Sequence, residues 1–414
     1  MRASGIVRQI CRSVLVEVHA ARVAVVLAAV DALVRGGRLA LTALGQRLES
    51  SALVKHRVKR IDRLLGNTHM HQELPLWYAA LAQRLLGQAR RPVVLIDWTQ
   101  TVGKFNALVA AVPFAGRAVP IYAEVHPSSD YNSRKVHKRF LERLACVLPK
   151  QAKPIIVTDA GFRTPFFRKV MDMHWDFVIR LRGRGVLRQL GSGGGKTRIP
   201  DRRLRFDEAF AMAIDRPQRL GRWCPYKTVG NPVIGELPIV IAARPEPRRS
   251  RRNAGTRDDA IYQRSALEPW LLATTLDEHP RRVVALYAMR MQIEETFRDA
   301  KSARFGWALE HAGSRQRDRQ AVLLLIACLA LAATLLTGAA VEAKGYARNF
   351  QANTVRSRRV QSLFHLGVFV LALGEPIMIP IPHIISRRKA LAKLLPAWFQ
   401  LRLPYTVFRR GRFV

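Results

Sequence analysis

The chain has 414 residues, 49% of them hydrophobic, so it can bury a large core and is too apolar for a disordered protein. Its 69 Lys and Arg against 30 Asp and Glu give a net charge of +39. This favours nucleic acid as partner, with an anionic membrane surface as the alternative and an arginine-rich composition from a GC-rich genome as a contributor. The four cysteines form no CxxC pair, which argues against a disulfide framework or a zinc site and fits a reducing cytosol.

Residues 1–85 are predicted to form a helical N-terminal DNA-binding domain. Residues 38–67 contain two segments of helical periodicity, and the second segment is basic. Two short helices with a basic second member are typical of helix-turn-helix DNA readers. The alternative is a helical hairpin whose basic face is solvated. The residues expected to contact DNA are Lys55, Arg57, Lys59 and Arg60.

Residues 86–184 change to short β-branched runs. Strands are predicted at 91–100, as a pair within 107–127, at 153–162 and at 175–183, with helices over 134–148 and between the last two strands. The order β-β-β-α-β-α-β predicts an α/β fold, with this segment as the first part of a ribonuclease H-like core.

Two aspartates are predicted to end hydrophobic strands of this core. Asp97 follows "VVLI" and Asp159 follows "IIVT". Ligands bind at strand ends of α/β sheets, and an acid after an apolar run needs a partner. A divalent metal ion is such a partner, because hard cations take carboxylate oxygens. The alternative is that each aspartate caps the turn that follows.

The rest of the chain is predicted to complete the core around an insertion. Residues 185–276 are expected to be a mostly β insertion with strands at 236–243 and 269–276 and flexible or basic loops at 191–197 and 244–257. The core then resumes over 277–345, and 346–414 form a basic region for dimerisation or DNA contact. The apolar run 321–341 is long enough to span a bilayer, but we interpret it as a buried core helix.

The stretch 287–301, "YAMRMQIEETFRDAK", is predicted to be one amphipathic helix. At 100° per residue, Tyr287, Arg290, Glu294 and Lys301 fall within roughly 60° of one another, beside an apolar stripe. Glu295 and Asp299 fall on the far side, and Glu295 is expected to face water. The helix would then bring Glu294 towards the strand ends.

The spacing Tyr-x2-Arg-x3-Glu-x6-Lys of this stretch resembles the signature of the DDE transposases of bacterial insertion sequences, in the IS-four family. The nearest likeness is to cut-and-paste transposases of tetracycline-resistance transposons. The segments "KRIDRLLGN", "DAGF", "EPW", "RMQIEETFRD" and "QANTVR" are similar to segments of these proteins. The resemblance runs from about residue 38 to about residue 370.

The resemblance implies roles for individual residues. It makes Asp97, Asp159 and Glu294 the catalytic triad, which holds Mg²⁺ or, as substitute, Mn²⁺, with two ions bound. It also implies that several residues hold DNA near this site, namely Tyr287, Arg290, Lys301, Arg298 and Trp270. Trp270 would stack on a flipped base, and the alternative for this residue is packing in the protein core.

The implied activity is cut-and-paste transposition through a hairpin intermediate. The DNA partners would be the terminal inverted repeats and the target, bound by a homodimer in the synaptic complex, and a host DNA-bending protein is left open. The protein is then expected in the bacterial cytoplasm, at the nucleoid, and not in a membrane. The alternatives are a non-catalytic basic regulator of element ends and a membrane protein spanning at 321–341.

Overall fold

The computed structural model describes residues 2–183, 185–189, 202–226, 235–242, 268–304, 306–352, 354–355, 359–373 and 379–388. These described residues fall into two compact units. Unit 1 is built from Met1–Ala152 and Met291–Leu395, and unit 2 is built from Lys153–Arg290. The predicted loops at 191–197 and 244–257 lie outside the described residues.

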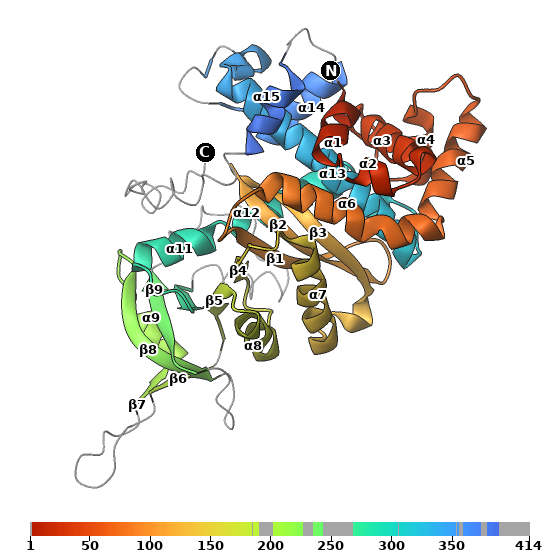
Figure 1. The fold of residues 1–414 in the computed structure, drawn as a ribbon. Coiled ribbons are helices and arrows are strands. Elements are labelled where there is room, and N and C mark those ends of the chain that lie inside the picture. The colour runs from red at the N-terminus through yellow and green to blue at the C-terminus, as the bar shows by residue number, and fades with distance from the viewer. Residues whose placement is uncertain are drawn as a thin grey trace, which may run out of the picture. The chain divides into compact units, whose positions relative to one another are not determined.

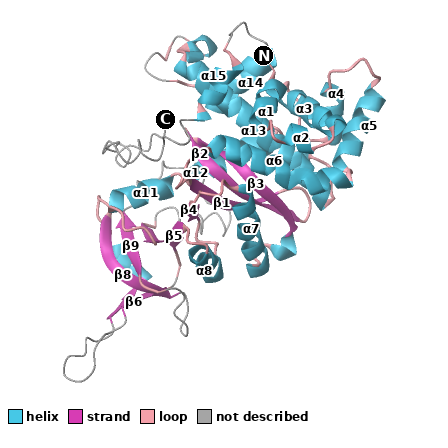
Figure 2. Cartoon of the chain, in the orientation of Figure 1, coloured by secondary structure: helices cyan, strands magenta, loops and turns pink. Residues whose placement is uncertain are grey.

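Unit 1 is mainly helical apart from three strands (Figure 2). Helices occupy the N-terminal stretch that the sequence predicts to be helical, and one more follows the strands. These helices are α1 (Ala3–Ile10), α2 (Val14–Glu17), α3 (Ala20–Val34), α4 (Leu41–Arg47), α5 (Val54–Leu65), α6 (Thr68–Leu86) and α7 (Arg134–Val147). The later elements are α12 (Met291–Lys301), η3 (Leu309–His311), α13 (Arg317–Ala343), η4 (Tyr346–Phe350), α14 (Leu363–Leu373) and α15 (Ile381–Ser386).

The strands of unit 1 form an antiparallel sheet in the order β3-β2-β1. They are β1 (Val93–Gln100), β2 (Phe105–Phe114) and β3 (Arg117–Pro127), with a short η1 (Ser128–Asp130) after the last. The β2–β3 turn consists of Ala115 and Gly116, whose φ angles of 47° and 91° are both left-handed. Two such residues match the right-handed twist of a hairpin, and glycine adopts this conformation without strain.

Helix α13 is the core of unit 1. It packs against β3 and against α1, α3, α6 and α14 (Figure 1). Among the described residues it is the single helix long and apolar enough to cross a membrane, yet 94% of its most apolar window is buried inside the protein. This burial favours the interpretation of 321–341 as a core helix.

Unit 2 contains a second set of strands in the order β4-β5-β10-β9-β8-β6-β7. Strands β4 and β5 pair in parallel, and the other pairings among the described residues of this unit are antiparallel. Helix α11 packs on β8 and β9 (Figure 2) as well as on β4, β5 and β10. The elements are β4 (Ile155–Thr158), α8 (Thr164–Asp172), β5 (Asp176–Leu181), β6 (Val186–Gln189), β7 (Arg202–Arg205), α9 (Phe206–Ala211), β8 (Gln218–Tyr226), β9 (Leu237–Ala242), β10 (Trp270–Thr274) and α11 (Pro280–Ala288).

The fold is mixed α/β, and the predicted element order from β1 to β5 is observed. The predicted single helix over 287–301 is wrong. Helix α11 ends at Ala288, α12 begins at Met291, and Met289 and Arg290 form a turn between them. The ribonuclease H-like topology and the predicted domain boundaries stay predictions.

Candidate active site

Asp97 lies within β1 of unit 1, opposite Val109 of β2. It is half-buried, with buried neighbours on both sides along the strand. Its Oδ1 accepts a hydrogen bond from the backbone N–H of Trp98 at 2.8 Å. The prediction that Asp97 ends its strand is wrong, because β1 continues to Gln100.

Helix α12 brings a second predicted site residue close to Asp97. The helix packs on all three strands of the unit 1 sheet and carries Lys301 in its last turn. Burial lowers the pKa of Lys301, and the nearby carboxylates of Glu310 and Asp97 oppose that shift. The ammonium group of Lys301 is therefore within electrostatic reach of the Asp97 carboxylate.

Glu294 lies in the first turn of the same helix and is half-buried. It belongs with Asp97 to unit 1, whereas Asp159 belongs to unit 2. No three His, Cys, Asp or Glu side chains within the described part of the chain form a group that could hold a metal ion. The chemistry of the predicted donors, three carboxylates, nevertheless fits a hard divalent cation.

Asp159 follows directly after β4, as predicted. Its Oδ1 accepts a hydrogen bond from the backbone N–H of Gly161 at 2.9 Å. A Cβ atom at Gly161 would come within 3.0 Å of the same oxygen. The "DAG" turn therefore holds the carboxylate against the backbone at a position that favours glycine.

Tyr287 is the centre of a buried cluster in unit 2. Its ring packs edge-on against the ring of Trp270, with centroids 4.9 Å apart, and the guanidinium carbon of Arg290 lies 6.0 Å from the Tyr287 centroid. Burial raises the pKa of Tyr287, Arg290 and Arg180 oppose the shift, and Asp159 adds to it. Three predicted site residues therefore lie together, with Asp159 within electrostatic reach.

Trp270 is only 8% exposed in this cluster. An edge-to-face pair of this kind stabilises a core by about 1 kcal/mol beyond the area it buries. This is the core packing that the sequence leaves open as the alternative for this residue. The stacking of Trp270 on a flipped base stays a prediction.

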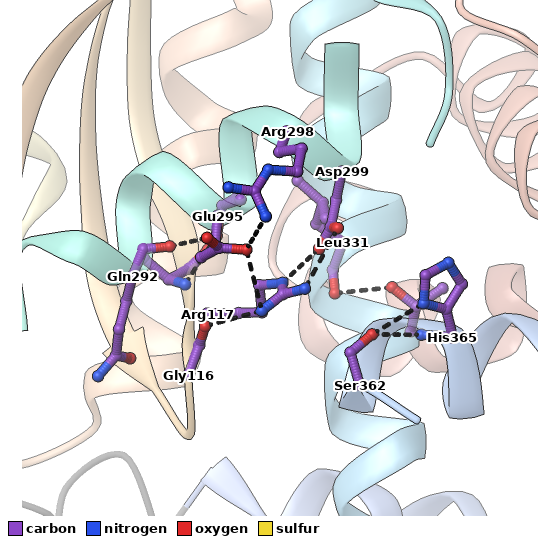
Figure 3. A network of polar contacts seen from close by, with 12 residues as sticks. Gly116, Arg117, Gln292, Glu295, Arg298, Asp299, Leu331, Ser362 and His365 are labelled. Carbon is purple, nitrogen blue, oxygen red and sulfur yellow. Dashed lines mark hydrogen bonds and ion pairs between the residues drawn. The ribbon is translucent and has the colours of Figure 1, made fainter. Parts of the chain in front are cut away.

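Glu295 does not point freely into water as predicted. Its carboxylate lies 2.8 Å from Arg298 Nη1 and 3.8 Å from Arg117 Nη1, and its side chain is 32% exposed. In Figure 3 the guanidinium of Arg117 lies between Glu295 and Asp299. Arg298, predicted to contact DNA, is 63% exposed while it pairs with Glu295.

The buried polar face of α12 is a feature that the sequence reasoning missed. Asp299 was expected on the solvent side, but its side chain is 4% exposed and its Oδ2 lies 2.6 Å from Arg117 Nε. Thr296 donates to the carbonyl oxygen of Ala118, and Gln292 accepts from Phe114 N–H. The signal in the sequence is three polar residues at i, i+4 and i+7, which share one helix face.

A second missed cluster surrounds Glu124 on β3. Burial alone would raise the pKa of Glu124, but hydrogen bonds from His126 and Tyr122 and the nearby Arg143 hold it below its ordinary value. Tyr122, Glu124 and His126 alternate along the strand, so they lie on one face of the sheet. That alternation of polar residues is the signal that could have identified them.

Three of the four α5 residues predicted to contact DNA are exposed. Lys55, Lys59 and Arg60 are exposed, whereas Arg57 is half-buried and donates from Nη1 to the carbonyl oxygen of Leu48 at 2.7 Å. A cavity of about 430 Å³ lies beside the helix. Its basic lining residues are Arg22, His56, Arg57, Lys59, Arg60 and Arg63.

Comparison with known proteins gives one result. Residues 88–332, more than half of the chain, match the model of a family described as "Transposase DDE domain". The matched range contains Asp97, Asp159 and the whole stretch 287–301. No curated protein matches the chain.

Proposed function

The chain belongs to the family of the transposase DDE domain, and from this premise we propose that it carries out cut-and-paste transposition of a bacterial insertion sequence. In this proposal it binds the terminal inverted repeats, excises the element and joins its 3′ ends to target DNA. It acts in the cytoplasm, at the nucleoid. The synaptic complex contains two copies of the chain, because two ends must be held together.

The observation that supports this function best is that Lys301 lies within electrostatic reach of Asp97 in unit 1. A half-buried lysine near a half-buried carboxylate provides an ammonium group beside a negative site. Phosphodiester chemistry needs such cations where charge develops on the transferred phosphoryl oxygens. Lys301 shares its helix with Glu294, and that helix packs on the strand of Asp97.

Asp97, Asp159 and Glu294 are the residues that would hold divalent Mg²⁺ or Mn²⁺ in this proposal. When bound, two such ions stabilise the attacking and leaving oxygens of an in-line displacement at phosphorus. Lys301 and Arg290 hold phosphate oxygens next to the scissile bond by charge-assisted hydrogen bonds. Tyr287 positions Arg290, because its ring lies beside the guanidinium.

The reaction proposed for these residues has successive displacements at phosphorus. Water attacks the phosphodiester at the element end and releases a 3′-OH. That 3′-OH attacks the phosphodiester of the opposite strand, which forms a hairpin on the element end and releases the flanking DNA with a free 3′-OH, and a second water opens the hairpin. The 3′-OH then attacks target DNA. Because each step has the same in-line geometry, one site can serve all of them.

The test is incubation of the chain with linear DNA that carries both ends of its element, in Mg²⁺ or Mn²⁺. We expect double-strand cleavage at the ends for the wild type and a loss of at least about 10³-fold for Glu294→Ala, since each metal-binding carboxylate is needed in the transition state. Glu295→Gln is the matched control. It removes a neighbouring carboxylate that pairs with Arg117 and Arg298, and it should retain cleavage.

The outcomes separate the candidates. Cleavage by Glu294→Ala at the wild-type rate, or loss of cleavage in Glu295→Gln alone, contradicts the assignment of the third carboxylate. Specific binding of the ends by the wild type without cleavage in either metal supports the alternative, a non-catalytic regulator of element ends.

A further inference from the structure

A pocket in unit 1 is lined by arginines from three separate parts of the chain. Its volume is about 700 Å³, and it lies among α1, α6 and α15. Helix α1 contacts both of the other helices (Figure 1). The arginines are Arg8, Arg12, Arg84 and Arg388.

No carboxylate lines this pocket among the described residues. In that part of the chain, no ion pair joins any of its four arginines to an acidic side chain. Burial lowers the pKa of Arg388, and the like charge of Arg84 lowers it further. Arg84 and Arg388 therefore repel each other, and a bound anion would relieve that repulsion.

The pocket suits an anion that extends beyond it. Arg8, Arg12 and Arg84 are exposed, and Arg388 is half-buried. A site for a free small molecule buries most of its ligand, whereas exposed arginines around an open pocket can contact successive groups of a polymer. Guanidinium groups match the geometry of phosphate oxygens, so a phosphodiester backbone fits this arrangement.

We propose that the pocket formed by α1, α6 and α15 binds backbone phosphates of duplex DNA. This surface is distinct from the basic face of α5, because the two cavities share no lining residue. The inference rests on the proposed function in that the bound DNA is the DNA being transposed. It supplies a contact that positions DNA without reading its sequence.

The test measures affinity for duplex DNA over a series of salt concentrations, in EDTA so that no cleavage occurs. Arg12→Gln/Arg84→Gln should bind more weakly, and the slope of log K against log salt should become shallower by about 1.8, since each phosphate contact contributes about 0.9. Lys138→Gln/Arg139→Gln, on the exposed surface of α7, removes the same charge and should keep the wild-type slope. Arg12→Lys/Arg84→Lys retains the charges and should restore most of the wild-type slope.

An unchanged slope in Arg12→Gln/Arg84→Gln, or an equal loss in the α7 control, overturns the inference. Stabilisation of the wild type against heat by inorganic phosphate, without any slope difference, would assign the pocket to a small phosphorylated ligand and would also overturn the inference.

Cleavage of end-bearing DNA is measured separately, with Mg²⁺. If the wild type cleaves while the slopes agree, only this inference fails. If the slopes differ and the wild type does not cleave, only the proposed function fails.

Discussion

Glu294 and Glu295 are neighbours in the sequence, and both are half-buried on α12. Glu295 pairs with Arg117 of β3 and Arg298 of its own helix. Helical arithmetic places the two glutamates on different faces of α12, because successive residues point 100° apart. It assigns the wrong face to water, however, since an apolar stripe was the sole guide to burial. A polar face that finds partners on a strand can be buried as well.

Arg117 and Asp299 form a pair whose loss can be measured. Arg117→Ala would leave the carboxylate of Asp299 buried without its cation, and we expect a loss of about 3 kcal/mol in unfolding free energy. Asp299→Ala/Arg117→Ala removes both charges and should lose less than the sum of the single changes. The measurement is urea unfolding of the four proteins. Additive losses would contradict a coupled pair.

The pair of Arg117 and Asp299 also predicts how the free energy of unfolding changes with pH. Burial raises the pKa of Asp299 above its ordinary value of 3.8, although Arg117 opposes that shift. A carboxyl with a raised native pKa binds a proton more readily in the folded state, so its burial destabilises the fold less as pH falls through that raised value. Arg117→Ala should accordingly recover part of its lost stability as the pH is lowered towards 4, relative to Arg117→Ala/Asp299→Ala.

At the scale of elements, the sequence predicts the strands and misses where one helix stops. The order from β1 to β5 follows from β-branched runs and from the Ala115–Gly116 turn, which are local signals. The break between α11 and α12 has no such signal, because Met289 and Arg290 are neither glycine nor proline. It coincides with the boundary between the two units, which depends on packing of distant segments.

In the candidate site, too, some features follow from local sequence signals and others depend on tertiary packing. Asp159 after β4 was predictable, since the apolar run and the "AG" turn define the strand end. Asp97 was placed at a strand end because the apolar run stops there. The strand continues to Gln100, the end of the predicted run 91–100, because Trp98, Thr99 and Gln100 pair with residues of β2. The clustering of Tyr287 with Trp270 likewise depends on tertiary packing of α11 on β10.

The contact between α13 and α14 depends on two glycines, and this predicts large effects of small changes. A Cβ at Gly338 would lie 2.0 Å from Leu363 O, and one at Gly367 would lie 1.8 Å from Thr334 O. Gly338→Ala and Gly367→Ala should each destabilise by about 3 kcal/mol, because two backbones must separate within a packed core. Thermal unfolding monitored by circular dichroism measures the loss.

Gly5→Ala is the matched control for these two substitutions. Gly5 is also inside a helix, but its Cβ would meet only the flexible end of Ile381, at 3.1 Å. Alanine is favoured over glycine in helices by roughly 0.5–1 kcal/mol, so this change should be close to neutral or stabilising. An unfolding midpoint for Gly338→Ala that equals that of Gly5→Ala would show that α13 and α14 do not approach closely.

At the scale of the whole molecule, the net charge of +39 predicts that DNA binding and DNA cleavage depend on different groups of residues. The basic α5 surface and the arginine pocket of unit 1 lie on elements other than those that carry Asp97, Asp159 and Glu294. Association with DNA should therefore be governed by release of counterions from phosphates. In the proposed function the carboxylates act in the chemical step, and they add nothing favourable to the attraction, because they carry the same sign of charge as DNA.

Removing metal and varying salt should accordingly affect different quantities. With EDTA we expect cleavage of end-bearing DNA to be lost while its affinity, measured by fluorescence anisotropy, stays within about threefold. Between about 50 and 200 mM salt the affinity should fall roughly 10³-fold or more, as six or more phosphate contacts require. An affinity that is flat over this range would contradict the polyanion interpretation of the charge. Cleavage that persists in EDTA would instead exclude carboxylate-bound metal from the reaction, whatever the salt dependence of binding.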